Sequence, residues 1–473
     1  MRRLDKEILS LAGPSILANI TVPLVGMVDI AVVGHLGAAA VRGGGNALTT
    51  AALIGGISIG SMLFDLLYWG FGFLRTGTGG LAAQAFGRRE KAGTGPDADL
   101  ARRDEADVLA RAVGIAMLSG VALIAVQWLF LRFAFLFIGC SPEVEALAMR
   151  YFRIRIWAAP ATLSLFAFKG WFIGMQDTVS AMRADLLVNG LNMAASAALA
   201  FGTPLGYDGV AAGTVIAQWS GLLFAAGVVA TKYRGAVFAG YTLQDARRAL
   251  RTDARAFFSM NMDLILRSVG MIAVYIGFTV LSARFGDALL SASAIIMKLM
   301  MVFSYFTDGF AYAGEALTGR AIGLQDSPML RQTVRSTFAW SMGVVGLFLV
   351  LYGAFGLPMV RLMTSDPAVV DTCRPFLPWL LLMPLVGCPA FTWDGIFTGA
   401  AATRPMRDGT LLSAVGFFGI WLLGRSLAGA FGGLGGDRPV QLLMAAYFAH
   451  LLIRSVWLHA AYRKQVPGRI AGN

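Results

Sequence analysis

The chain has 473 residues, of which 57% are hydrophobic and only 14% are charged, and its mean hydropathy is +0.67. A soluble domain carries about 25% charged residues, so this composition excludes an ordinary soluble protein and favours one with many membrane spans. The net charge of +12 would suit a nucleic-acid partner, but the basic residues cluster between apolar runs, so we expect none.

Long apolar segments follow one another along the whole chain. Each is long enough to cross about 30 Å of hydrocarbon, and each must be helical to satisfy its own backbone. The sequence therefore predicts an all-α integral membrane protein with twelve transmembrane helices, near residues 8–34, 46–74, 112–138, 147–175, 185–204, 209–231, 259–283, 287–320, 334–362, 375–401, 409–430 and 440–462.

The basic residues predict the orientation of these spans. Cytoplasmic loops are enriched in Lys and Arg, and we therefore expect both termini on the cytoplasmic side of the inner (plasma) membrane. The clusters that carry this prediction lie at residues 2–6, 88–111, 232–255, 320–335, 404–407 and 463–469.

The chain also contains an internal repeat. GGLAAQAFGRRE (79–90) in the first half matches EALTGRAIGLQD (315–326) in the second, and WFIGMQDTVSAMR (171–183) matches GIFTGAAATRPMR (395–407), with Gly174 aligned to Gly399. An even number of spans per half gives both halves the same direction, which predicts two parallel six-helix repeats. We expect an N-lobe over 1–231, a cytoplasmic linker over 232–258 and a C-lobe over 259–473. The basic linker is either an interfacial helix on lipid headgroups or a solvated connector.

Asp29 is the only formal charge between Glu7 and Arg42, and it lies inside the first apolar run. A carboxylate in hydrocarbon costs about 2.5–3.5 kcal/mol on insertion scales, so it usually faces a cavity and has a function. Binding a proton or a metal cation is the natural task of such a group. The alternative is a carboxyl group that only bonds a neighbouring helix. Pro14 and Pro23 precede Asp29, and each removes a helical hydrogen bond and favours a bend.

Two spacings carry further predictions. Asn189, Asn192 and Ser196 share one helix face, either as a polar site or as contacts between helices. Asp263 and Arg267 are four residues apart, and this spacing predicts a local ion pair.

The segment from Gly56 to Gly60 fits the Gly-x-Ser-x-Gly pattern of esterases. It lies in an apolar helix rather than at a strand-to-helix turn, so we interpret it as the Gly-x-x-x-Gly spacing of close helix contact.

The sequence resembles the MATE (multidrug and toxic compound extrusion) family, and most closely its DinF-like branch. The resemblance covers nearly the whole chain, and its carriers are ILSLAGPSILANITVPLVGMVDIAVVGHLG (8–37), GFLRTGTGGLAAQAFGR (72–88), DGFAYAGEALTGRAIG (308–323) and FTWDGIFTGAAATRPMR (391–407). It implies two six-helix lobes around a central cavity, which export organic cations or other amphiphiles in exchange for H⁺ or Na⁺.

The resemblance also implies roles for particular residues. Asp29 matches the coupling carboxylate of the N-lobe, Pro14 the start of the helix bend, and Asn192 and Thr214 further ligands. Ser196 stands where the family's second carboxylate is expected. Asn189, Ser196 and Asp65 are therefore additional candidates around Asp29, with Asp65 a candidate for the missing carboxylate. Asp308 and Asp394 are candidates for cavity or coupling roles in the C-lobe.

Two rival functions need other features. A flippase for lipid-linked precursors needs cationic groups for phosphate, and the candidates are Arg75, Lys169, Arg267, Lys298 and Arg454. A membrane enzyme needs paired Asp-rich or His-centred motifs, which we do not find, so we expect no enzymatic activity. We expect no cofactor and no bound metal apart from a possible Na⁺ at Asp29. The expected partners are small organic, cationic or amphiphilic substrates and membrane lipids, for a monomeric protein. Substrate identity, H⁺ against Na⁺, and stoichiometry stay open.

Overall fold

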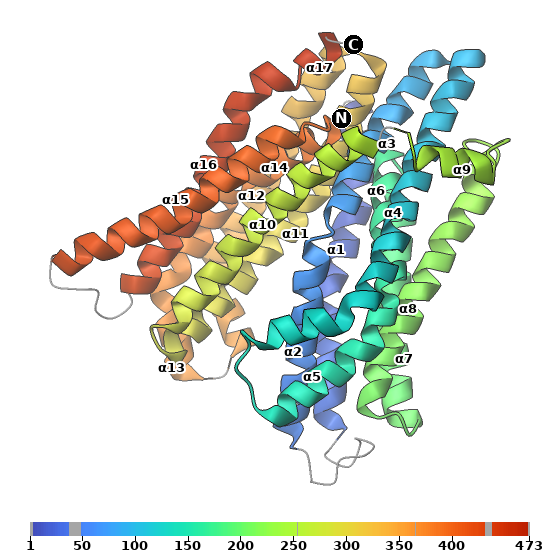
Figure 1. Ribbon diagram of the computed structural model, residues 1–473. Coiled ribbons are helices and arrows are strands. Elements are labelled where there is room, and N and C mark those ends of the chain that lie inside the picture. The colour runs from blue at the N-terminus through green and yellow to red at the C-terminus, as the bar shows by residue number, and fades with distance from the viewer. Residues whose placement is uncertain (1–2, 37–48, 253, 365, 431–437, 472–473) are drawn as a thin grey trace. The chain divides into compact units, whose positions relative to one another are not determined.

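The computed structural model describes residues 3–36, 49–252, 254–364, 366–430 and 438–471, and these ranges contain helices and connections but no β-strand (Figure 1). The chain divides into two compact units. We call Leu17–Arg255 the N-terminal unit, and Met1–Ile16 together with Ala256–Asn473 the C-terminal unit. The first helix is shared between them. The lobe boundaries expected from the sequence remain a prediction.

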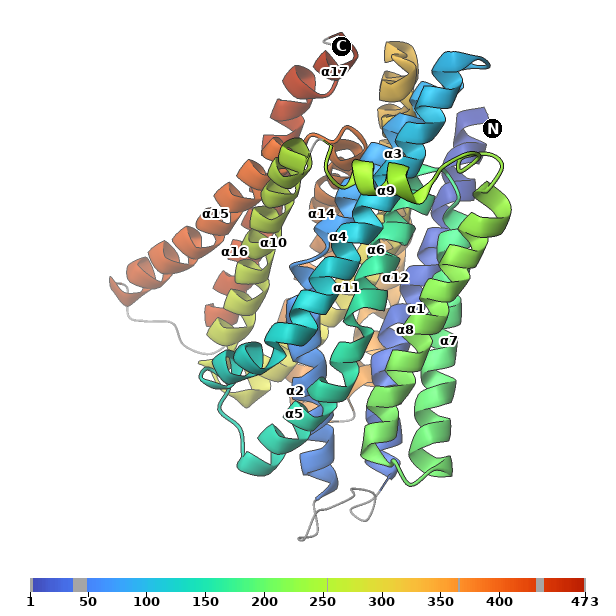
Figure 2. The ribbon, with the colours of Figure 1, turned by 45° about the vertical axis from the view of Figure 1, so that its right-hand side comes forward.

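The N-terminal unit holds most of α1 and all of α2 to α9. In it, α7 and α8 lie side by side in both views (Figures 1 and 2). The helices are α1 Arg3–His35, α2 Thr50–Trp69, α3 Phe73–Ala92, α4 Pro96–Phe135, α5 Pro142–Arg155, α6 Ala159–Gly174, α7 Thr178–Gly202, α8 Tyr207–Val228 and α9 Leu243–Ala249.

The C-terminal unit contains the remaining helices, and here α15 and α16 lie side by side (Figure 2). Their bounds are α10 Ala254–Ala283, α11 Asp287–Leu324, α12 Ser327–Met363, α13 Pro367–Cys373, α14 Leu377–Gly399, α15 Thr403–Ala430, α16 Arg438–Gln465 and α17 Gly468–Ala471.

Twelve helical stretches among the described residues are long and apolar enough to cross a membrane, as the sequence predicted. The helices extend beyond the apolar runs. The expected loop over 88–111 is largely helical, since α3 continues to Ala92 and α4 begins at Pro96. Proline suits the first turn of a helix, where its missing N–H is not needed, and Asp97 and Asp99 favour that end of the helix dipole.

Among the described residues of the linker, one short helix, α9, lies wholly inside it, between the end of the π-helix Val229–Tyr233 and the start of α10 at Ala254. Its N-cap Thr242 and Asp245 form a reciprocal capping box. The interfacial and the solvated interpretations of this segment both stay predictions.

The internal repeat appears as a repeated helix contact. Gly174 on α6 packs so closely on α3 that a Cβ atom there would lie 2.5 Å from the carbonyl oxygen of Gly79. Gly399 on α14 packs in the same way on α11, where a Cβ atom would lie 2.2 Å from the carbonyl oxygen of Glu315. The two contacts join positions that the sequence motifs align, Gly174 with Gly399 and Gly79 with Glu315. Glycine is needed because helices in lipid associate by close packing of small residues.

Each of these helices then ends in the same turn. Gln176 and Ala401, which the same alignment places together, have positive φ angles of 60° and 50°. In the first turn the amide of Asp177 donates to the carbonyl of Phe172 at 2.7 Å. In the second, the amide of Ala402 donates to the carbonyl of Phe397 at 3.0 Å. The two halves therefore share backbone geometry as well as sequence.

The Gly-x-x-x-Gly interpretation of residues 56–60 is confirmed. A Cβ atom at Gly56 would lie 2.6 Å from Cβ of Leu147, and one at Gly60 would lie 2.6 Å from the ring of Tyr151. This face of α2 is thus a packing surface for α5.

Candidate functional site

Asp29 lies on α1 and is almost fully buried, with 6% of its surface exposed. Its Oδ1 atom makes no hydrogen bond within the described ranges, and there its carboxyl group belongs to no ion pair. An ionised carboxylate left in this state would carry a large desolvation penalty. A carboxyl group in this state can accept a proton or a cation.

Ser196 on α7 is a polar neighbour of this carboxyl group. Its hydroxyl group is buried near Asp29 and donates to the carbonyl of Val210 on α8 at 3.2 Å. The backbone of Ser196 packs against Gly213, where a Cβ atom would lie 2.4 Å from the Ser196 nitrogen. The close α7–α8 contact therefore holds Ser196 in place.

Asn192 and Thr214 form a second pair on these two helices. Asn192 Nδ2 donates to Thr214 Oγ1 at 2.8 Å, and Thr214 donates on to the Val210 carbonyl at 3.3 Å. Both side chains are buried, yet Asn192 Oδ1 has no hydrogen-bond partner in the described part of the chain. An amide oxygen in this state is a suitable ligand for a hard cation or a proton donor.

Asn189 lies one turn earlier on α7 and contacts α1. Its Nδ2 atom donates to Thr21 Oγ1 at 2.7 Å, and Thr21 in turn donates to the carbonyl of Ala18 at 2.7 Å. Asn189 therefore joins α7 to the helix that carries Asp29, and one of its two amide hydrogens is engaged in this bond.

Arg155, at the end of α5, is a residue that the sequence reasoning missed. It hydrogen-bonds Tyr151 Oη at 3.0 Å and lies over the ring of Phe64 at 4.8 Å. It interacts electrostatically with both Asp29 and Asp65 without forming an ion pair to Asp29 in the part of the chain described. The group of basic residues Arg150, Arg153 and Arg155 inside the predicted span 147–175 was the signal that could have revealed it.

Asp65 lies exposed on α2. Arg155 interacts electrostatically with Asp65 as well as with Asp29, so the same guanidinium group influences both carboxylates.

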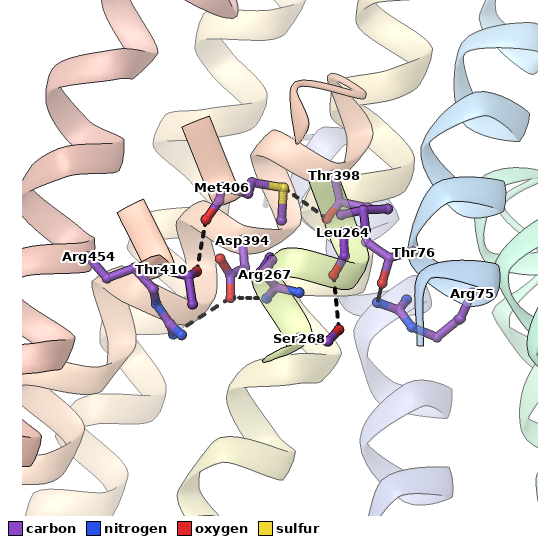
Figure 3. Close-up of polar contacts among 10 residues, drawn as sticks. All are labelled: Arg75, Thr76, Leu264, Arg267, Ser268, Asp394, Thr398, Met406, Thr410 and Arg454. Atoms are coloured by element: carbon purple, nitrogen blue, oxygen red, sulfur yellow. Dashed lines mark hydrogen bonds and ion pairs between the residues drawn. The ribbon is translucent and has the colours of Figure 1, made fainter. Parts of the chain in front are cut away.

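Asp394 on α14 is the centre of a charged cluster in the C-terminal unit (Figure 3). Arg267 on α10 donates to its Oδ2 atom at 2.7 Å, and Arg454 on α16 approaches the same oxygen at 3.6 Å. Its Oδ1 atom has no hydrogen-bond partner within the described ranges. This candidate is thus neutralised by fixed guanidinium groups, in contrast to Asp29.

The predicted ion pair between Asp263 and Arg267 is wrong. Asp263 accepts from Arg407 at 2.6 Å and from Thr403 at 3.0 Å, both on α15. Asp263 and Arg267 share a helix face, but each forms its ion pair with a residue of a neighbouring helix, Arg407 and Asp394 respectively.

The remaining predicted residues lie near the shared helix. α1 continues unbroken through Pro14, which is half-buried. On either side of it, Ala12 and Ile16 pack on α11 at Gly309, where a Cβ atom would lie 2.4 Å from Ile16 Cγ1. Asp308, next to Gly309, is half-buried. Among the described residues no three His, Cys, Asp or Glu side chains gather as a metal site.

The twelve candidate spans place the chain in the class of multi-pass membrane proteins. In the described ranges its secondary structure consists of helices only. The MatE family model matches residues 14–197 and 264–421, and the chain belongs to that family of multidrug and toxin efflux transporters, as the sequence resemblance indicated.

Individual relatives agree. The chain is 32% identical over 415 residues to "DNA damage-inducible protein F" of Escherichia coli K12, covering 87% of this chain and 84% of the relative. It is 25% identical over 316 residues to "Probable multidrug resistance protein NorM" of Brucella suis, covering 63% and 64%.

Solved structures show the same fold. The eukaryotic MATE transporter AtDTX14 superposes with a TM-score of 0.80 at 14% identity, covering 99% of this chain and 98% of its own. The Vibrio cholerae MATE transporter VcmN in its bent form gives 0.77 at 17% identity, covering 98% of each.

Proposed function

We propose that the protein is a cation-coupled antiporter of the cytoplasmic membrane, which exchanges H⁺ or Na⁺ for organic cations or other amphiphiles. The observation that carries this proposal is Asp29, a buried carboxyl group with an open oxygen and no ion-pair partner in the described part of the chain. Ser196 and the open Oδ1 atom of Asn192 supply neutral oxygens on the facing helix.

Coupling follows from the charge of Asp29. An unpaired carboxylate is disfavoured in a dry interior, so binding a cation stabilises any conformation in which Asp29 is enclosed. A ligand shifts a conformational equilibrium by its difference in affinity for the two states. Pro14 marks the place where α1 can respond by bending, because its helical hydrogen bond is missing.

The proposed orientation has both termini in the cytoplasm. The basic clusters around residues 88–111, 232–255 and 404–407 support it, since cytoplasmic loops attract Lys and Arg. We also propose that the protein works as a monomer.

The test is efflux of ethidium or norfloxacin from proteoliposomes under a pH gradient or a Na⁺ gradient applied separately. Asp29→Asn should abolish gradient-driven efflux while the protein stays folded and monodisperse. Asp99→Asn removes an exposed carboxylate of the same unit and should leave efflux unchanged. Full efflux by Asp29→Asn would refute the role of Asp29. Efflux that persists in Asp65→Asn would show that Asp65 is not required for coupling, in contrast to Asp29.

The flippase alternative has less support. Lys169 is paired with Asp185 at 2.5 Å and Lys298 is exposed, so two of its five candidate cations are committed to an acid or lie at the surface. A fluorescent-lipid translocation assay in the same proteoliposomes would decide between the two functions.

A further inference from the structure

We propose that Arg454 and Arg267, with Asp394 as their shared counter-ion, bind an oxyanion, the carboxylate or phosphate group of an amphiphilic molecule. This site lies in the C-terminal unit and is separate from the coupling proposed at Asp29. It rests on the proposed function and extends it, by giving the negatively charged part of a substrate a place to bind.

The argument begins with charge. Two guanidinium groups meet one carboxylate, and that carboxylate is already hydrogen-bonded to Arg267 at 2.7 Å. Arg454 is 3.6 Å from the same oxygen, which is beyond hydrogen-bonding distance. The cluster of Arg267, Asp394 and Arg454 therefore carries one uncompensated positive charge.

Burial makes this charge significant. Arg454 is only 1% exposed, and Nε, Nη1 and Nη2 all have no hydrogen-bond partner in the described ranges. Nε of Arg267 is in the same condition. Buried charges normally have partners, because leaving one unpaired in an apolar interior is strongly unfavourable. The unpartnered donors of Arg454 are therefore suited to bind a negatively charged group.

Neighbouring acids among the described residues do not supply it. Asp263 is one turn from Arg267 but is committed to Arg407 and Thr403. Asp408 pairs with Arg407 at 2.7 Å. The titratable side chains that interact with Arg454 besides Asp394 include His450 and Tyr447, neither of which carries a negative charge at neutral pH.

The geometry selects the chemistry of the ligand. A guanidinium presents a planar fork of donors that matches a carboxylate or phosphate in a bidentate manner. The guanidinium of Arg454 also lies over the ring of Phe391 at 5.6 Å, so an apolar surface adjoins the charge. Figure 3 shows Arg267 and Arg454 reaching Asp394 from two different helices. An amphiphile with one oxyanion fits both features.

The experiment measures equilibrium binding of 11-(dansylamino)undecanoate to the full chain in phosphatidylcholine nanodiscs, with its neutral carboxamide as the matched probe. We expect the carboxylate to bind more tightly than the amide. Arg454→Gln should weaken carboxylate binding about tenfold or more, because a charge-assisted hydrogen bond is lost, and Arg454→Lys should weaken it less. Arg361→Gln removes an exposed arginine of the same unit and should change nothing.

Asp394→Asn should change the affinity for the carboxylate probe in the opposite direction from Arg454→Gln. Removing the competing carboxylate should tighten carboxylate binding, whereas a purely structural cluster would be weakened by either substitution. Equal binding of carboxylate and amide would overturn the proposal. So would unchanged binding by Arg454→Gln, or weaker binding by Asp394→Asn. If Arg454→Gln does not fold, Arg454→Lys and Asp394→Asn decide the question.

Two further arms identify the source of the oxyanion. Nanodiscs with phosphatidylglycerol that displace the probe would identify a lipid phosphate as the ligand, and undiminished probe binding would identify a soluble amphiphile. Asp29→Asn should abolish driven efflux but leave probe binding intact. Failure of the proposed coupling is therefore distinguishable from failure of this site.

Discussion

Arg267 on α10 binds Asp394 on α14 at 2.7 Å, although Asp263 precedes it by one helical turn on its own helix. A pair within one helix contributes only about 0.3–0.5 kcal/mol when exposed. The buried partners offered by α14 and α15 outcompete it. The ion pairs of these two side chains therefore connect helices rather than turns of one helix.

A double-mutant cycle should show this choice of partner. We expect Asp263→Asn and Arg407→Gln to be coupled by about 1 kcal/mol or more in thermal unfolding of the detergent-solubilised protein. The cycle of Asp263→Asn with Arg267→Gln should give less than half of that coupling. Equal coupling in both cycles would contradict the observed arrangement.

The repeated glycine contact should be intolerant of a single methyl group. A Cβ atom at Gly395 would lie 2.1 Å from the carbonyl oxygen of Ala311, so Gly395→Ala should destabilise the protein by about 1–3 kcal/mol through overpacking. Gly170→Ala should do the same, because its Cβ would lie 2.2 Å from the carbonyl oxygen of Arg75.

Gly343→Ala is the matched control, since nothing lies within 4 Å of a Cβ atom at that position on α12. Alanine there should be neutral, or stabilising by about 0.5–1 kcal/mol. Thermal unfolding followed by tryptophan fluorescence measures all three variants, and similar melting temperatures would argue against the close contacts.

Asp177, in the turn between α6 and α7, should give a pH-dependent contribution to stability. Burial opposes its ionisation, but hydrogen bonds from Lys232 at 2.7 Å, from the Ser180 amide and from Tyr233 at 2.9 Å outweigh it and lower the pKa of Asp177 below its usual 3.8. A lowered folded pKa stabilises the protein fully above the usual value, and this contribution is lost as pH falls below 3.8.

Asp177→Asn should therefore lower stability by about 1–3 kcal/mol at pH 7. The difference from wild type should stay constant down to about pH 5 and shrink as the pH falls below the usual pKa of an aspartate. Thermal unfolding across this range measures it, and a difference that already changes near neutral pH would assign the effect to another group.

Asn192 should influence the affinity for the coupling cation. Its Oδ1 atom is buried and open, so Asn192→Ala removes a neutral ligand worth about 0.5–1.5 kcal/mol. We expect the cation concentration for half-maximal efflux to rise about 2–10-fold, with maximal efflux preserved. Asn189→Ala should have a smaller effect, because that amide bonds Thr21 instead. Equal effects of both substitutions would remove the distinction.

Much of this protein could be predicted from the chain alone. Hydropathy located the membrane-crossing helices, and the aligned repeat motifs foretold that Gly174 and Gly399 occupy corresponding places in the packing. Asp29 stood out because a charge in an apolar run is costly wherever its neighbours lie. These features depend on solvation and local periodicity, which a single stretch of residues carries with it.

The partners of the charged side chains were decided only by tertiary structure. Spacing predicted an ion pair of Asp263 with Arg267, but in the folded protein Asp263 pairs with Arg407. Arg454 is buried with donors that have no partner among the described residues. Arg155 became relevant to Asp29 only once α5 was placed against α2. A side chain's electrostatic neighbours lie on other helices, and the packing of small residues sets which faces meet, so residues far apart in the sequence determine the chemistry of each charge.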